Sequence, residues 1–182
     1  MQEIAEDCGM SVANLYRYYE GKLALGATVA AAEQAALFAT CDRAVMAARG
    51  DLTAKLITLF QVLIDGTCRQ IKATPLLFDL GMTVTRELPE HRQRFLQEIE
   101  ARIAAILAAG GGDGAVAAAD PKIASRLILM ASAPFVLPWM LRTLPLGNPR
   151  LQVEPLMKCL VAGFTEANSN GVAAAAHHGD QP

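Results

Sequence analysis

The chain has 182 residues, a formal net charge of −2 and a sequence pI of about 5.9. Hydrophobic residues make up 53% of it and aromatic residues only 5%, with much of the apolar content supplied by alanine. The charge excludes a globally basic nucleic-acid coat, although a local basic patch remains compatible with specific binding. Because alanine favours helices over strands, the composition predicts an all-α protein.

The N-terminal segment predicts two short helices and the start of a long one. Residues 1–8 form a helix that Gly9 ends with a left-handed cap, and Ser11 is a good N-cap for a helix over 12–18. A long helix follows over 22–48. A short helix, a glycine turn and a serine-capped helix rich in tyrosine are typical of a helix-turn-helix DNA reader.

Further helices are expected after Gly50. Each has apolar residues repeating at three and four positions, and several begin at a capping residue or a proline. Asp51 or Thr53 caps the first of them. The expected ranges are about 52–71, 75–87, 89–109, 121–144 and 151–167, with a glycine-rich break at 110–114 and a turn at 145–149.

Cysteine usage and hydropathy predict a cytoplasmic protein. Cys8, Cys41, Cys68 and Cys159 are far apart and lack metal-binding spacing, as expected for reduced thiols. The most hydrophobic run, 127–141, is shorter than the roughly 20 residues that a membrane span needs and contains two prolines. We therefore expect a buried core helix there, and no membrane partner.

No residue set indicates an enzyme. His91 lies beside Arg92 and Arg94, while His177 and His178 lie in the C-terminal tail. No Ser/His/Asp set, metal-ligand spacing or phosphate-binding loop is visible. We expect no catalysis, no cofactor and no metal.

The N-terminal pattern resembles the DNA-binding signature of the tetracycline-repressor (TetR) family. In that signature glycine ends the first helix, serine caps the second, and aromatic residues precede a lysine at the next helix start. The residues that carry the resemblance are Ile4, Ala5, Gly9, Ser11, Leu15, Tyr16, Tyr18, Tyr19, Lys22 and Leu25. The resemblance implies a DNA-binding repressor that a small apolar or amphipathic effector releases from its operator.

The resemblance also implies which side chains contact double-stranded DNA. In the recognition helix over 12–18, asparagine suits adenine and arginine suits guanine, so four side chains can face base edges: Val12, Ala13, Asn14 and Arg17. Hydroxyl groups and one lysine at a helix start can contact phosphates: Ser11, Tyr16, Tyr18 and Lys22.

The middle helices, by the same resemblance, enclose an effector pocket, and the last two pair with a second subunit in a four-helix bundle. The homodimer would suit a palindromic operator. The pocket candidates are Phe60, Leu63, Phe78, Met82, Phe135 and Trp139, with Thr85 and Arg86 as polar anchors. Core packing is the alternative for the apolar residues, and a surface ion pair is the alternative for Arg86.

The expected domains are a head with its connecting helix (1–48), an effector-binding and dimerisation domain (49–168) and a disordered tail (169–182). Family members have a helix before this motif, whereas the sequence begins inside the second helix of the unit, so a truncated head is expected. Residues 1–22 hold two basic residues against four acidic ones, a balance of −2. The alternative function is therefore a homodimer that binds a small molecule but not DNA.

Overall fold

The structure is a computed structural model of the chain and describes residues 1–110, 120–142 and 147–177, with side chains of the last helix up to Phe164. Regular structure in these ranges is helical, as the composition predicts, and includes no strand. The helices are α1 Gln2–Asp7, α2 Val12–Tyr18, α3 Lys22–Ala47, α4 Leu52–Ala73, α5 Pro75–Glu87, α6 Pro89–Ala109, α7 Pro121–Val136, α8 Pro138–Leu141 and α9 Pro149–His177.

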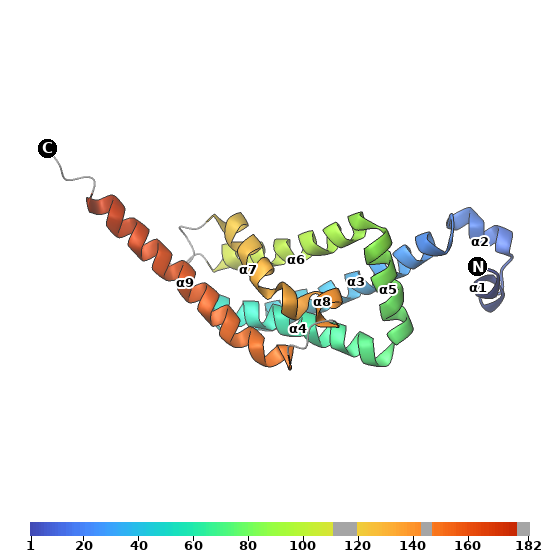
Figure 1. Ribbon diagram of the computed structural model, residues 1–182, viewed down its shortest axis with the longest axis horizontal. Helices are drawn as coiled ribbons and strands as arrows, with labels where there is room; N and C mark the ends of the chain where they lie inside the picture. Colours follow the sequence, from blue (N-terminus) through green and yellow to red (C-terminus); the bar gives the residue numbers. More distant parts are fainter. Residues whose placement is uncertain (111–119, 143–146, 178–182) are drawn as a thin grey trace.

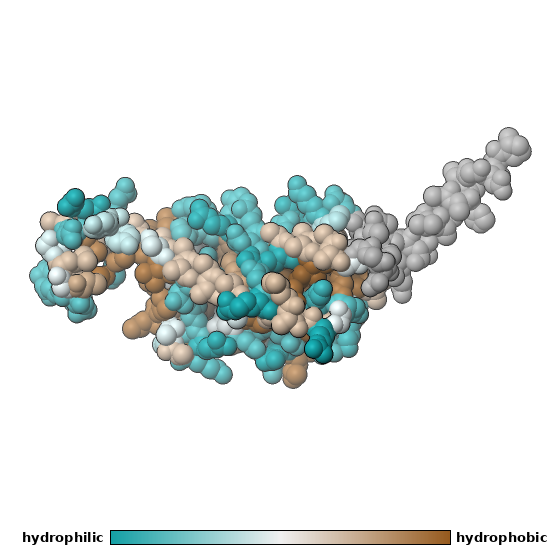
Figure 2. Space-filling model, turned by 180° about the vertical axis from the view of Figure 1, so that it is seen from behind, coloured by the Kyte–Doolittle hydropathy of each residue, from teal (hydrophilic) through white to brown (hydrophobic). Residues whose placement is uncertain are grey.

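The molecule consists of a small head and a larger body. Figure 1 shows α4 to α9 gathered around most of α3, with α1 and α2 beyond the end of α3 that projects from the body. The space-filling view in Figure 2 shows the head and the body as two masses joined by a narrower neck. The head is therefore held to the body chiefly through α3.

Most helix starts follow local chemistry that the sequence contains. The Asp51 carboxylate accepts a hydrogen bond from the Ala54 amide at 2.9 Å and begins α4. Asp120 caps α7 in the same way through the Lys122 amide, also at 2.9 Å. Helices α5 and α6 each begin at a proline, whose missing N–H group costs nothing in the first turn. These predicted starts are confirmed.

Two predicted boundaries were wrong. The single helix expected over 121–144 is divided at Leu137, which is extended (φ −79°, ψ 124°) because the ring of Pro138 disfavours a helical residue before it. The last helix, expected over 151–167, begins at Pro149 and continues to His177, through alanines of high helix propensity. Residues 169–177 of the predicted disordered tail therefore belong to this helix.

Three predicted segments lie wholly or partly outside the described residues. They are most of the glycine-rich break at 110–114, the beginning of the turn at 145–149 and the last five residues of the tail.

The body is organised around α4. Its side chains Leu56, Leu59 and Phe60 are fully buried in a core to which α3, α6, α7 and α9 also contribute. On α6, Ile99 and Ile103 are equally buried, as the predicted apolar face of that helix requires. One continuous core thus fixes the helices of the body relative to one another.

Two segments are long and apolar enough to cross a membrane by length and composition: Lys22–Ala47 and Pro121–Leu141. Of these windows, 22% and 39% respectively is buried inside the structure. Both segments pack against other helices of the body, and core helices of soluble proteins pass the same test.

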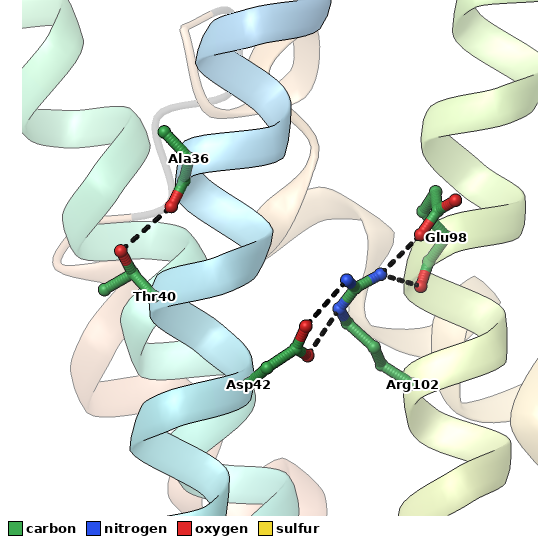
Figure 3. Close-up of polar contacts among 5 residues, drawn as sticks. All are labelled: Ala36, Thr40, Asp42, Glu98 and Arg102. Atoms are coloured by element: carbon green, nitrogen blue, oxygen red, sulfur yellow. Dashed lines mark hydrogen bonds and ion pairs between the residues drawn. The ribbon is translucent and has the colours of Figure 1, made fainter.

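Arg102 on α6 ties α6 to α3. Its guanidinium donates to both carboxylate oxygens of Asp42, at 2.8 and 3.0 Å, and to the Glu98 carboxylate at 2.6 Å (Figure 3). It also lies over the ring of Phe38, 4.3 Å from the centroid. Burial opposes the charge, but the hydrogen bonds with Asp42 and Glu98 outweigh it and raise the pKa of Arg102. The Glu98–Arg102 pair has the i,i+4 spacing that brings two side chains together on one helix, and Asp42 is a third partner from α3.

Replacing Arg102 with Ala is expected to lower the free energy of unfolding by about 1–3 kcal/mol, because three charge-assisted hydrogen bonds are lost from a side chain only 20% exposed. Urea denaturation measures the change. Arg86→Ala is the matched control, since Arg86 pairs only with its neighbour Glu87 at the surface, and should cost less than about 0.5 kcal/mol. Equal losses in the two variants would contradict a stabilising role for the Arg102 cluster.

Candidate functional site

The turn between α1 and α2 is built by Gly9, as the sequence predicts. Gly9 has a φ of +65°, the left-handed conformation that glycine adopts without strain. The Gly9 amide donates to the Glu6 carbonyl, and the Met10 amide donates to the Ala5 carbonyl, which together form a Schellman motif. This motif turns the chain so that α2 packs on α1, with Ala5 of α1 fully buried and Leu15 of α2 buried as well.

Helix α2 presents a polar and aromatic face to solvent. Since Leu15 is buried, the residues on the other side of the helix, Ala13, Tyr16 and Arg17, are exposed. Of the two tyrosines on the helix, Tyr18 is 69% exposed and Tyr16 is 51% exposed. Two more predicted DNA contacts, Val12 and Asn14, are half-buried. The structure thus brings the predicted DNA-binding residues of α2 onto one short helix at the tip of the head.

Ser11 and Lys22 lie at the N-termini of α2 and α3. The Ser11 hydroxyl accepts a hydrogen bond from the Asn14 amide at 3.1 Å, so the predicted cap is confirmed. The same hydroxyl retains its own proton for donation. Lys22 is exposed and begins α3 after Gly21, which has no side chain to cap the first-turn amides. Both helix starts carry donors suited to phosphate oxygens.

Helix α5 crosses α3 at the neck. A Cβ atom at Gly26 would lie 2.7 Å from the Leu80 side chain, so glycine allows the two helices to approach closely without displacing Leu80. Next to it, Ala27 and Ala30 of α3 and Val84 of α5 form a small buried cluster separate from the main core. The contact lies near Lys22, and α3 continues from it directly into the head.

A cavity with a volume of about 380 Å³ opens between α3, α4 and α5. Apolar side chains of these helices form most of its wall, and Phe95 of α6 and Pro138 of α8 contribute to it. Arg142, after α8, forms an ion pair with Asp79 and lies 5.7 Å from the Phe78 ring centroid, which holds α8 against α5. The volume is within the range of about 300–1,000 Å³ typical of ligand sites.

Three of the predicted pocket residues line this cavity: Phe78, Met82 and Thr85, all on α5. Phe60 and Leu63 instead lie in the main core, and Phe135 and Trp139 pack against that core. Arg86 is exposed and pairs with Glu87 at 2.9 Å, as its alternative interpretation predicts.

Other cavity residues were not singled out in the sequence. These are chiefly polar or small side chains on α3, α4 and α5: Gln34, Thr67, Gln70 and Gly81. The sequence contains a signal for Thr67: it is a polar residue at the next position of the three- and four-residue spacing set by Phe60, Leu63 and Ile64 on α4. Gly81 was also visible as a glycine within a helix.

An apolar stripe of α7 remains exposed. Ile123, Leu127 and Met130 recur at four and three residues and are 59%, 46% and 66% exposed, while the neighbouring Ile128 and Leu129 are buried. On α9, Pro155, Cys159 and Ala162 follow one another along the exposed side. Apolar and small residues on adjacent helix surfaces are suited to packing against another protein surface.

The cysteines are free thiols in different environments. Cys8 and Cys159 are exposed, whereas burial raises the pKa of Cys41 to about 11. A thiol reagent near neutral pH should therefore modify Cys8 in the folded protein, and Cys41 only after unfolding. Ellman's titration with and without denaturant measures this, and modification of Cys41 at the rate of Cys8 would contradict it.

Comparison with known proteins identifies the fold and the family. Residues 53–154 match the family model described as "Tetracyclin repressor-like, C-terminal domain". The structure is similar to that of a proposed transcriptional regulator from Pseudomonas aeruginosa PAO1, with 18% identity and a TM-score of 0.65 over 93% of this chain and 82% of that one. No curated protein matches the sequence.

Because the sequence identity is only 18%, the similarity to this solved structure shows a shared fold and not a shared function. The family model covers more than half of the chain and includes all of α5, α6 and α7, together with the cavity-lining parts of α4 and α8. The chain therefore belongs to the tetracycline-repressor family of transcriptional regulators.

Proposed function

We propose that the chain is a repressor that binds a palindromic DNA operator as a homodimer and leaves it when a small apolar or amphipathic effector enters the cavity between α3, α4 and α5. The observation that carries the proposal is the exposed face of α2, with Arg17 and two tyrosines at the tip of a head that barely packs on the body. An arginine there can donate two hydrogen bonds to guanine, and the tyrosine hydroxyls can contact phosphates.

Helix α3 supports a route from the cavity to the head. Gln34 and Leu37 of α3 line the cavity, and the same helix begins at Lys22 beside the head. Helix α5 also lines the cavity and packs on α3 at Gly26. An effector that moves α5 against α3 would change the angle of the head, and the two recognition helices of a dimer would no longer match successive major grooves.

The exposed stripe on α7, together with the outer side of α9, is the proposed dimer interface. A second copy of the chain related by twofold symmetry would cover Leu127 and Met130 with the same residues of its partner. Two heads would then be presented on one assembly, as two half-sites require.

The test is fluorescence anisotropy of the chain with labelled DNA from either side of its gene, over a range of salt concentrations. A regulator should bind one fragment well above the others, with affinity falling steeply as salt rises, because counterions are released from the phosphates. Equal, weak binding to all fragments would contradict the proposal.

The alternative is a homodimer that binds a small molecule without binding DNA. The acidic balance of the head favours it, since Glu3, Glu6 and Asp7 of α1 are all exposed. The DNA titration, together with a direct measurement of ligand binding, distinguishes this alternative from the repressor. Ligand binding without any salt-dependent DNA binding would support it.

A further inference from the structure

The volume of the cavity between α3, α4 and α5 indicates the size of a ligand that would fill it. An engineered protein cavity of about 150 Å³ holds benzene. At about 380 Å³, this cavity has room for two fused six-membered rings with a small substituent. Phe78, Met82 and Phe95 lie in its wall and offer aromatic faces and a thioether, which pack well against a ring system.

The inner wall of the cavity carries no charge. Its two charged residues, Glu33 and Arg69, are exposed at the rim and have opposite signs. The half-buried polar side chains, Gln34, Gln70 and Thr85, are all neutral. A charged group on a ligand would lose its water without gaining a buried counter-charge, which disfavours its binding.

Thr67 supplies a hydrogen-bonding group inside the cavity. The residue is only 3% exposed, and no partner for its hydroxyl occurs among the described residues. By contrast, two other threonines of the cavity wall, Thr40 and Thr74, donate to backbone carbonyls of their own helices, and Thr85 is less buried than Thr67. No side-chain polar atom buried in the described part of the protein lacks a partner, so the Thr67 hydroxyl must reach the cavity surface. It is available to a ligand oxygen.

Gly81 leaves space in the opposite wall. A Cβ atom built at Gly81 would meet no atom within 4 Å, although the residue lies within α5 and lines the cavity. The missing side chain therefore contributes volume to the cavity, whereas a Cβ at Gly66 would lie 2.4 Å from the Leu37 side chain and would displace it. Gly81 is the position at which the cavity can be filled without disturbing the helices around it.

We infer that the cavity takes an uncharged ligand of two fused rings that carries one hydroxyl or carbonyl oxygen, which the Thr67 hydroxyl binds. This inference rests on the proposed role of the cavity as the effector site. The ring system lies against Phe78 and Met82, with one edge over Gly81, and the oxygen points to α4.

A probe series tests size, charge and polarity together. The probes are 2-naphthol, naphthalene, 2-naphthoate and 2-naphthylmethylammonium, each titrated into the full chain by fluorescence or calorimetry. We expect 2-naphthol to bind, and the anion and the cation to bind at least about tenfold more weakly because their charges are desolvated. Binding of either charged probe as tight as that of 2-naphthol would overturn the inference, as would no binding of 2-naphthol up to its solubility limit.

Matched variants locate the contacts. Thr67→Val should weaken 2-naphthol by about 2- to 10-fold and leave naphthalene unchanged, because only the hydrogen bond is removed. Thr58→Val is the control on the same helix, since the Thr58 hydroxyl donates to the Ala54 carbonyl and does not line the cavity. An unchanged affinity of Thr67→Val for 2-naphthol would overturn the assignment of the hydroxyl.

Gly81→Leu provides an independent test that does not depend on polarity. The leucine side chain should fill the cavity and abolish binding of every probe, while circular dichroism and the melting temperature stay close to those of the wild type. Undiminished 2-naphthol binding by a folded Gly81→Leu variant would show that the ligand lies elsewhere and overturn the inference.

The DNA titration separates this inference from the proposed function. Specific DNA binding without 2-naphthol binding would overturn the ligand assignment and leave the regulator proposal in place. Binding of 2-naphthol with the expected response to Thr67→Val, but no DNA binding, would support the ligand assignment and contradict the repressor.

Discussion

Arg17→Ala is expected to weaken binding of the operator by about 1–3 kcal/mol, or roughly tenfold to a hundredfold, because an arginine that bonds guanine in the major groove is the commonest specific contact. Arg17 is exposed on the face of α2 opposite Leu15, and no ion pair of the described residues uses it. The loss should be greatest for the preferred DNA fragment and smaller for unrelated DNA. Fluorescence anisotropy at constant salt measures both.

Two further variants test whether the effect of Arg17→Ala is specific to base recognition by α2. Arg92→Ala is the control, because Arg92 is also an exposed arginine but lies on α6 of the body and not on α2, and it should leave DNA binding unchanged. Lys22→Ala should weaken binding to all sequences alike and reduce the salt slope by about one, as expected for a phosphate contact. Equal effects of Arg17→Ala and Arg92→Ala would show that α2 does not read the operator.

Met130→Arg is expected to convert the proposed dimer to monomers at micromolar concentration. Met130 is 66% exposed at the C-terminal end of the α7 stripe, and twofold symmetry would bring one unpaired arginine from each subunit into an apolar interface. Analytical ultracentrifugation measures the mass. Binding of palindromic DNA should fall together with dimerisation, since a monomer carries only one recognition helix.

Met46→Arg is the control for this variant. Met46 is 87% exposed near the C-terminal end of α3 and is not part of the α7 stripe, so the same chemical change there should not alter the mass. Dissociation of both variants would point to a general loss of stability. A dimeric Met130→Arg would place the interface elsewhere on the molecule.

The helices of the head could be predicted from capping and turn residues alone. A glycine that accepts a positive φ at position 9, a capping hydroxyl at Ser11 and a helix break at Gly21 each act within a few residues, so the sequence predicted α1, α2 and the start of α3. The all-α class follows in the same way from alanine content and apolar spacing. The family resemblance, carried by 10 residues of the head, is confirmed by a match in the body, which the resemblance did not use.

The residues that line the cavity could not be predicted from local sequence patterns. On α4, successive side chains point about 100° apart, so Leu63 enters the core while Val62 and Gly66 face the cavity. Apolar residues occur on both faces, and only the positions of α3 and α5 decide which of them lie in the core. Phe60 and Leu63 were therefore reasonable pocket candidates that became core residues, and Thr67 became the polar group of the cavity.

The sequence by itself determined the helices, their caps and the helix-turn-helix pattern, because these depend on neighbours along the chain. The tertiary structure alone decided which apolar residues of α7 are exposed, as with Leu127 and Met130 beside the buried Ile128 and Leu129. It also decided the pairing of Arg102 with Asp42, which lie 60 residues apart. The physical reason is that burial and pairing depend on which helix faces become neighbours, and this is settled by packing across the whole body.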